Sequence, residues 1–114
     1  MAQPNTLMVD DIKYVREDSI QATFKTVQDH PYPTGKNVFI RTVTMNYTGK
    51  LVAVTEKELV LEDVAWIADS GRFNEALKSG KLNEVEPFPA GKVIIGRDGA
   101  EVSIWAHALP REVK

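Results

Sequence analysis

The sequence predicts a mainly β protein, a small and strongly bent barrel with one short helix inserted at about residues 70–79. Three observations predict it. A long stretch rich in β-forming residues covers 37–68, and a charged turn at Thr55–Glu58 divides it. A second pair of short strands is expected over 92–105, around a glycine-bounded turn. Between them, residues 69–91 form a helical insertion and a connector.

Length and composition place the chain among ordinary globular proteins. Its 114 residues suit a single domain, and 43% apolar and 26% charged residues argue against disorder over most of it. The net charge of −2 gives no general attraction for polyanions, so nucleic-acid binding needs a local basic patch. The chain has no cysteine, no secretory leader pattern and no apolar run near the roughly 18 residues of a membrane span. We therefore expect a cytoplasmic protein without membrane partners.

The first part of the chain carries weak signals. Residues 1–10 are expected to form a loosely ordered arm. Residues 12–20 fit either a short helix capped by Asp10 or Asp11 or an extended edge segment, and the spacing of their apolar residues does not decide between them. Residues 21–27 alternate like a strand, and the two prolines and the glycine of 30–36 predict a loop.

The organising stretch is expected to begin with one long strand from Asn37 to Val54 that bends at Gly49. A residue without Cβ lets a strand coil sharply or form a bulge. After the Thr55–Glu58 turn, residues 59–67 return antiparallel, with Asp63 accepting backbone N–H bonds at a strand end. Together these residues form the first predicted hairpin, over 37–68.

The helix is expected over 72–79, with Asp69 or Ser70 as its N-cap and Gly80 as its end. The connector from Lys81 to Pro89 offers two apolar anchors, Val85 and Phe88. Residues 92–95 and 100–105 then form the two strands of the second hairpin, around Gly96–Gly99.

These two hairpins resemble the paired motifs of the Sm-like superfamily, which includes a bacterial RNA chaperone. The first motif is read in Gly49–Asp63, as a glycine, alternating apolar residues, a turn, further apolar residues and a closing acid. The second is read in Val93–Arg97. The chain is also similar to compact Sm-like proteins of phages and mobile elements, and SH3-like barrels share the bent glycine strand. The resemblance covers about half of the chain.

The resemblance implies a homo-oligomeric ring of roughly five to seven copies, closed by pairing of edge strands. It also implies RNA binding where the two turns converge on the pore, which here assigns Lys57 and Arg97, with Lys50 in support. The flanking acids Glu56, Glu58 and Asp98 oppose this charge. The sequence also departs from the family: Thr55 stands where an acid is usual, the first turn lacks an asparagine or aromatic residue, and residues 66–91 are an addition.

The alternative is a structural or scaffolding protein of a phage or mobile element that works through protein contacts without nucleic acid. Its interface would use the large aromatic residues Trp66, Phe73 and Trp105, which otherwise belong to the core.

Neither reading is enzymatic. His30 and His107 lack a serine or carboxylate at motif spacing and are expected on the surface, and Glu62, Asp63 and Asp69 are expected to have structural roles. Gly96–Gly99 lacks the length and the Lys-Ser/Thr ending of a phosphate-binding loop. We therefore predict no catalytic residue, no metal and no cofactor.

Overall fold

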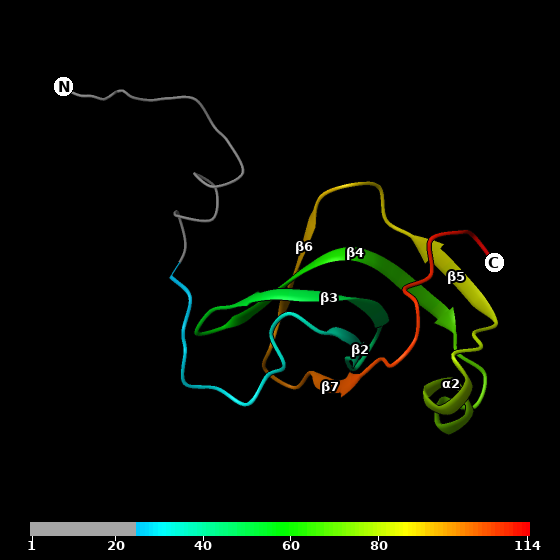
Figure 1. Ribbon diagram of the computed structural model, residues 1–114, viewed down its shortest axis with the longest axis horizontal. Coiled ribbons are helices and arrows are strands. Elements are labelled where there is room, and N and C mark those ends of the chain that lie inside the picture. Colours follow the sequence, from blue (N-terminus) through cyan, green and yellow to red (C-terminus); the bar gives the residue numbers. More distant parts are fainter. Residues whose placement is uncertain (1–24) are drawn as a thin grey trace.

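The structure is a computed structural model that describes residues 25–114; the predicted arm over 1–10, the segment over 12–20 and most of the strand over 21–27 lie outside the described residues. Within that range the chain forms one antiparallel sheet of six strands and one short helix, so the mainly β prediction is confirmed. The strands are β2 (Asn37–Arg41), β3 (Asn46–Val54), β4 (Glu58–Asp69), β5 (Glu84–Pro87), β6 (Lys92–Gly96) and β7 (Glu101–Ile104), and the helix is α2 (Phe73–Ser79) (Figure 1).

The sheet is organised around β3 and β4. The strand order is β5-β4-β3-β2-β7, and β6 pairs with β4 beside β5. The first half of β4 thus lies between β3 and β6, and its second half between β3 and β5. Figure 1 shows β3 and β4 curving together across the molecule. No ladder joins β6 to β7 in the described residues, so the sheet stays open there.

The long strand predicted from Asn37 to Val54 is wrong, because the chain turns between β2 and β3. The Thr42 side chain makes this turn: its hydroxyl donates to the Met45 carbonyl at 2.8 Å and accepts from the Met45 N–H at 2.9 Å. The Thr42 N–H also donates to the Met45 carbonyl at 2.8 Å. A threonine hydroxyl that bonds nearby backbone groups competes with the strand ladder, which explains why a stretch of β-forming residues breaks here.

The predicted bend at Gly49 is confirmed. The pairing of β3 with β4 shifts register between Thr48 and Lys50, as it does at a β-bulge. A Cβ on Gly49 would lie 3.0 Å from the Val64 Cγ2 atom and 3.3 Å from the Glu62 carbonyl oxygen. A side chain at this position would therefore need β4 to move by a few tenths of an ångström.

The turn at Thr55–Glu58 is confirmed as the link between β3 and β4. The Thr55 N–H donates to the Glu58 carbonyl at 2.9 Å, and the Thr55 hydroxyl bonds the Glu58 carboxylate. Asp63, however, does not end a strand: β4 continues to Asp69, and Asp63 stands inside it with a φ of 53°. Asp tolerates this left-handed conformation better than most residues, so β4 continues past this irregular position.

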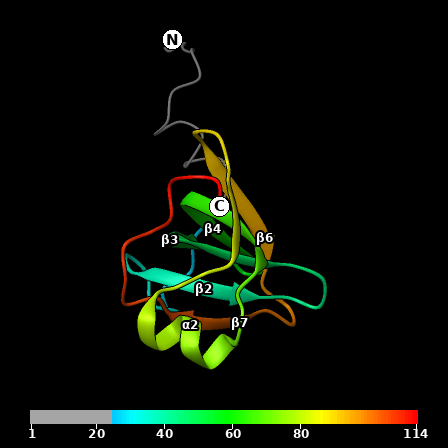
Figure 2. The same cartoon turned by 90° about the vertical axis from the view of Figure 1, so that its right-hand side faces the viewer.

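The helix and its end at Gly80 are confirmed, whereas its predicted cap is wrong. Arg72 occupies the N-cap position without a side-chain hydrogen bond, and the Asp69 carboxylate accepts from the Gly71 N–H instead. Gly80 adopts the left-handed conformation, with φ 77°, and its N–H donates to the Ala76 carbonyl. Figure 2 shows α2 beside β2 and β7 at one end of the sheet. No helix in residues 25–114 is long and apolar enough to cross a membrane.

The second predicted hairpin, over 92–105, is wrong in its pairing. Both strands form, but β6 pairs with β4, and β7 pairs with β2. The turn between β6 and β7 carries the chain from one side of the sheet to the other. At its start the Arg97 N–H donates to the Lys57 carbonyl at 2.9 Å. The connector also contains an unpredicted strand, β5, which brings the anchor Val85 into the core.

Two clusters of buried side chains form the core. The first fills the bend of the sheet and contains Val38, Ile40, Leu51, Val54, Leu59, Leu61, Val64 and Ile95. The second lies between the sheet and α2 and contains Phe39, Ala65, Ile67, Ala76, Leu82, Val85 and Trp105. Successive residues of β2 thus point into different clusters, as strand geometry requires.

β2 and β7 are also joined by a surface ion pair. The Arg41 guanidinium donates to the Glu101 carboxylate at 2.5 Å, and this hydrogen bond lowers the pKa of Glu101 below its ordinary value. A carboxylate whose pKa is lowered by folding stabilises the folded state fully at pH values above its unfolded pKa. This stabilisation is lost as the pH falls through the folded pKa. We expect the Glu101 side-chain carboxyl signal in NMR to titrate below the usual range for glutamate, and to return to that range in Arg41→Gln. A normal Glu101 titration in the unmodified protein would contradict the pairing.

Candidate binding surfaces

The turns that carry Lys57 and Arg97 lie side by side. The ladder between β4 and β6 ends at the pair Glu58 and Gly96, so the residues just outside it become neighbours. They border a hollow of about 700 Å³, here called the two-turn cleft, which is lined by Tyr32, Glu56, Lys57, Arg97, Asp98, Gly99 and Ala100. Two of the three predicted RNA-binding residues are thus brought together by the fold.

Arg97 is the least satisfied polar group of this cleft. The centre of its guanidinium group lies 5.4 Å from the centroid of the Tyr32 ring, within the range of a cation–π contact. Its Nη1 atom is buried and has no hydrogen-bond partner among the described residues. A buried cationic donor without an acceptor is unfavourable, and because Nη1 has almost no exposed surface, an anion could bond it only after the Arg97 side chain moves.

The net charge of the two-turn cleft is nevertheless close to balanced. Lys57 and Arg97 are opposed by Glu56 and Asp98 in the same lining. Lys50 does not add to it, because it lies exposed in β3 opposite Asn37 and Glu62, outside the cleft. One copy of the chain therefore offers directed donors here, without a strong positive field.

The three predicted interface residues have different surroundings. Trp105 is a core residue, 2% exposed, whose indole N–H donates to the Ala108 carbonyl at 3.1 Å. Phe73 is half-buried between the Phe39 ring, at a centroid distance of 5.3 Å, and the Arg41 guanidinium, at 3.8 Å. Only Trp66 presents a substantial open surface, with 37% of its area exposed.

Trp66 belongs to an apolar hollow of about 340 Å³, here called the aromatic groove, which is lined by Met45, Tyr47, Trp66, Glu86, Pro87, Phe88 and Pro89. The sequence did not predict this groove, because its residues come from three separate segments. The expectation that Phe88 is an apolar anchor is wrong, because 41% of its surface is exposed and it lines this groove.

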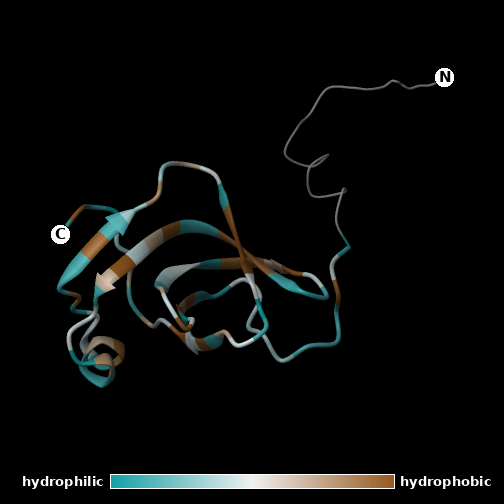
Figure 3. Cartoon of the chain, turned by 180° about the vertical axis from the view of Figure 1, so that it is seen from behind, coloured by the Kyte–Doolittle hydropathy of each residue, from teal (hydrophilic) through white to brown (hydrophobic). Residues whose placement is uncertain are grey.

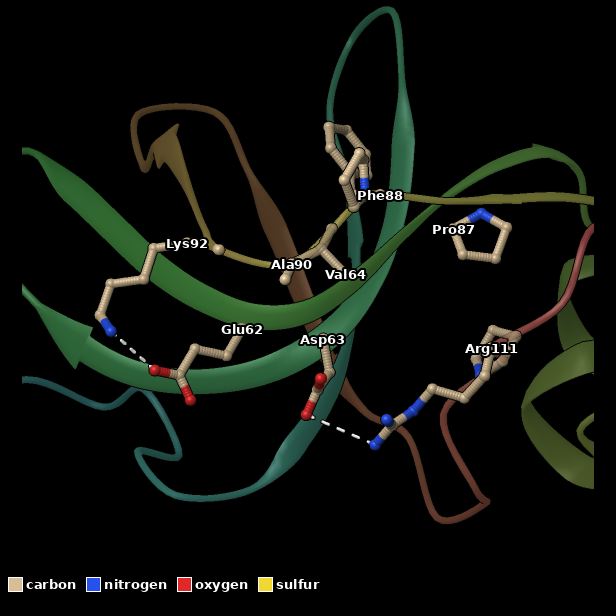
Figure 4. Close-up of a pocket in the computed structure, with 11 residues that line it drawn as sticks. Glu62, Asp63, Val64, Pro87, Phe88, Ala90, Lys92 and Arg111 are labelled. Atoms are coloured by element: carbon tan, nitrogen blue, oxygen red, sulfur yellow. Dashed lines mark hydrogen bonds and ion pairs between the residues drawn. The ribbon is translucent and has the colours of Figure 1, made fainter.

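A charged pocket of about 380 Å³ lies on the other side of the 87–89 segment (Figure 4). In it the Lys92 ammonium lies 2.7 Å from the Glu62 carboxylate, and the Arg111 guanidinium lies 3.4 Å from the Asp63 carboxylate. Figure 4 shows both pairs along β4, while the Phe88 ring points away from them. Each acid thus has a basic partner, and within residues 25–114 no group of three or more acidic or histidine side chains is placed to hold a metal ion.

Neither histidine stands free on the surface. The His30 Nδ1 atom accepts from the Tyr32 N–H at 3.0 Å. The His107 Nε2 atom lies 2.8 Å from the Leu77 carbonyl oxygen, and its ring packs against Trp105 at a centroid distance of 4.9 Å. The expectation of two surface histidines is therefore wrong for His107, which is half-buried and attaches the C-terminal segment to α2.

Two strand edges remain open. β6 pairs only with β4 and β7 only with β2, and no ladder covers their other edges in the part of the chain that the structure describes. Each strand exposes a large aliphatic side chain, Ile94 at 63% and Ile104 at 52%. The edge of β5 differs, because Val85 exchanges two backbone hydrogen bonds of 3.0 Å with Lys114.

No protein-family model, no curated protein and no solved structure matches this chain.

Proposed function

We propose that this chain is a non-enzymatic binding and assembly protein that forms a ring, with β6 of one copy pairing with β7 of the next. The open edges of these two strands carry the proposal. An exposed row of unpaired N–H and C=O groups is a template for another strand, and proteins that stay monomeric usually protect such edges with charges, prolines or bulges. β6 begins with Lys92 but exposes Ile94 at 63%, while Val93 and Ile95 pack into the first core cluster, and Figure 3 shows its hydrophobic middle.

The strand order supports a closed assembly. Going outward from β3, the sheet ends in β7 on one side, and on the other side β4 is followed by β6 along its first half and by β5 along its second half. Joining β6 of one copy to β7 of another uses two different surfaces, which is a head-to-tail contact, and such contacts form rings when the rotation closes. The bent sheet would then act as a barrel-like subunit of an Sm-like ring.

The assembly is tested by placing a charge on the open edge. In Ile94→Lys the exposed aliphatic group of β6 becomes a cation, and we expect sedimentation velocity to show a shift from the oligomer to the monomer. Val43→Lys is the matched control, because Val43 is 97% exposed in the turn between β2 and β3, outside the two edge strands, and should keep the oligomer. An oligomer that survives in Ile94→Lys and in the corresponding Ile104→Lys would overturn the pairing.

A second function, RNA binding at the two-turn cleft, is favoured by the unpartnered Nη1 atom of Arg97. A ring would repeat this donor in every subunit, and phosphate contacts would make binding fall steeply with salt. We expect Arg97→Gln and Lys57→Gln to weaken binding of a labelled single-stranded oligouridine, each lowering the salt slope by about one. Lys78→Gln, an exposed change on α2, is the control. Equal losses in all three variants would remove the cleft as the binding site.

A further inference from the structure

The aromatic groove gathers several exposed apolar side chains in one hollow. Met45 is 44% exposed, Trp66 37% and Phe88 41%. Side chains of this size are usually covered in a monomer, and an exposed apolar hollow with a polar rim marks an interaction site. The groove lies on the half of β4 that pairs with β5, so it does not depend on the open edges of β6 and β7.

Backbone pairing holds the walls of the aromatic groove in place. Tyr47 and Trp66 are direct partners in the ladder between β3 and β4, and Trp66 is the partner of Glu86 in the ladder between β4 and β5. The Phe88 N–H donates to the Val64 carbonyl at 2.8 Å, and the Phe88 ring lies 6.3 Å from the Tyr47 ring. The prolines at 87 and 89 fix the backbone on either side of it. Little conformational entropy would thus be lost when a ligand binds.

The groove also carries a few polar groups. Within residues 25–114 the Trp66 indole N–H and the Tyr47 hydroxyl have no hydrogen-bond partner, so both donors can bond a ligand. Glu86 is the one charged residue of the lining, and among the described residues it forms no ion pair. The groove therefore combines flat apolar walls, two hydrogen-bond donors and a single negative charge.

We propose that the aromatic groove binds an extended, proline-containing peptide segment of a partner protein, with a basic side chain of that segment beside Glu86. A polyproline II segment has no internal hydrogen bonds, so its carbonyl groups are free to accept from the groove's donors. Its prolines pack on aromatic rings, and its stiffness limits the entropy lost on binding. Charge complementarity selects a basic residue over an acidic one.

Within residues 25–114, the proline-containing segments outside the groove suit this role poorly. Leu109, Pro110 and Arg111 have the required composition, but Leu109 packs against the second core cluster and Arg111 pairs with Asp63. Pro31 and Pro33 flank Tyr32, which packs against the first core cluster. Neither of these segments is placed to fill the groove, and charge complementarity to Glu86 favours a partner segment with a basic residue.

The test uses the full chain and two short fluorescein-labelled peptides of proline and leucine, one ending in arginine and the other in glutamate. We expect saturable binding of the arginine peptide by fluorescence anisotropy and weaker binding of the glutamate peptide. Trp66→Ala should weaken binding by at least about tenfold, as at a central interface residue. Val113→Ala, which shortens an aliphatic side chain that is 73% exposed outside the groove, should leave binding unchanged.

Glu86→Arg keeps the apolar walls and should reverse the preference between the two peptides. The proposal is overturned if neither peptide binds, if Trp66→Ala binds as tightly as the unmodified chain, or if Glu86→Arg leaves the preference unchanged. It is also overturned if Trp66→Ala lowers the sedimentation mass, because the groove would then be an interface between copies.

Discussion

Replacing Phe39 by alanine should lower the free energy of unfolding by about 3–5 kcal/mol, the usual cost of truncating a buried aromatic side chain. Phe39 is completely buried in the second core cluster, with the rings of Phe73 and Trp105 at centroid distances of 5.3 Å and 5.7 Å. Its loss leaves a cavity where β2, α2 and the C-terminal segment meet. Urea unfolding, followed by circular dichroism, measures the change.

Phe88→Ala is the matched control for this prediction. It makes the same chemical change at a ring that is 41% exposed in the aromatic groove, and it should cost less than about 1 kcal/mol. Similar losses in the two variants would mean that Phe39 does not lie at the centre of a packed cluster.

Replacing Gly49 by valine should lower the free energy of unfolding by about 1–3 kcal/mol, the usual range for overpacking a core. The first added carbon already meets the Leu61 Cδ2 atom at 3.2 Å and the Glu62 carbonyl at 3.3 Å. The backbone carbonyl cannot rotate away as a side chain can, so β3 and β4 must separate near the bulge. The variant is measured by the same urea unfolding.

Gly96→Val provides the comparison. Gly96 is also a strand residue, the last of β6, but nothing lies within 4 Å of the position that its Cβ would take. We expect its stability to change by less than about 0.5 kcal/mol. If both glycines tolerate valine equally, the close approach of β4 to Gly49 is refuted.

The sequence predicted best those elements that are encoded by local chemistry. The Thr55–Glu58 turn is charged and lies between apolar runs, Gly80 has the left-handed conformation that suits glycine, and Gly49 lies where a side chain would meet β4. The turn between β2 and β3 was missed because Thr42, Val43, Thr44 and Met45 include no glycine, proline or asparagine, and the Thr42 side chain makes the turn instead. Asp63 was predicted to end a strand, because no residue around it signals that its irregular backbone conformation lies inside a strand.

The binding surfaces were less predictable, since they depend on which strands pair. Lys57 and Arg97 lie together only because β6 pairs with β4, whereas Lys50 lies apart in β3. Tyr47, Trp66 and Phe88 are far apart in the sequence and meet through the ladders on both sides of β4. Trp105 follows the edge strand β7 and was predicted as an interface residue, but it is buried in the second core cluster.

The central claim, assembly through the open edges of β6 and β7, is tested most directly by the native mass of the purified chain, measured by native mass spectrometry over a range of concentrations. We predict one closed oligomer of fixed subunit number, and the ultraviolet absorbance ratio of the same sample shows whether RNA accompanies it. A monomer at every concentration, or an open-ended series of oligomers, would contradict the ring.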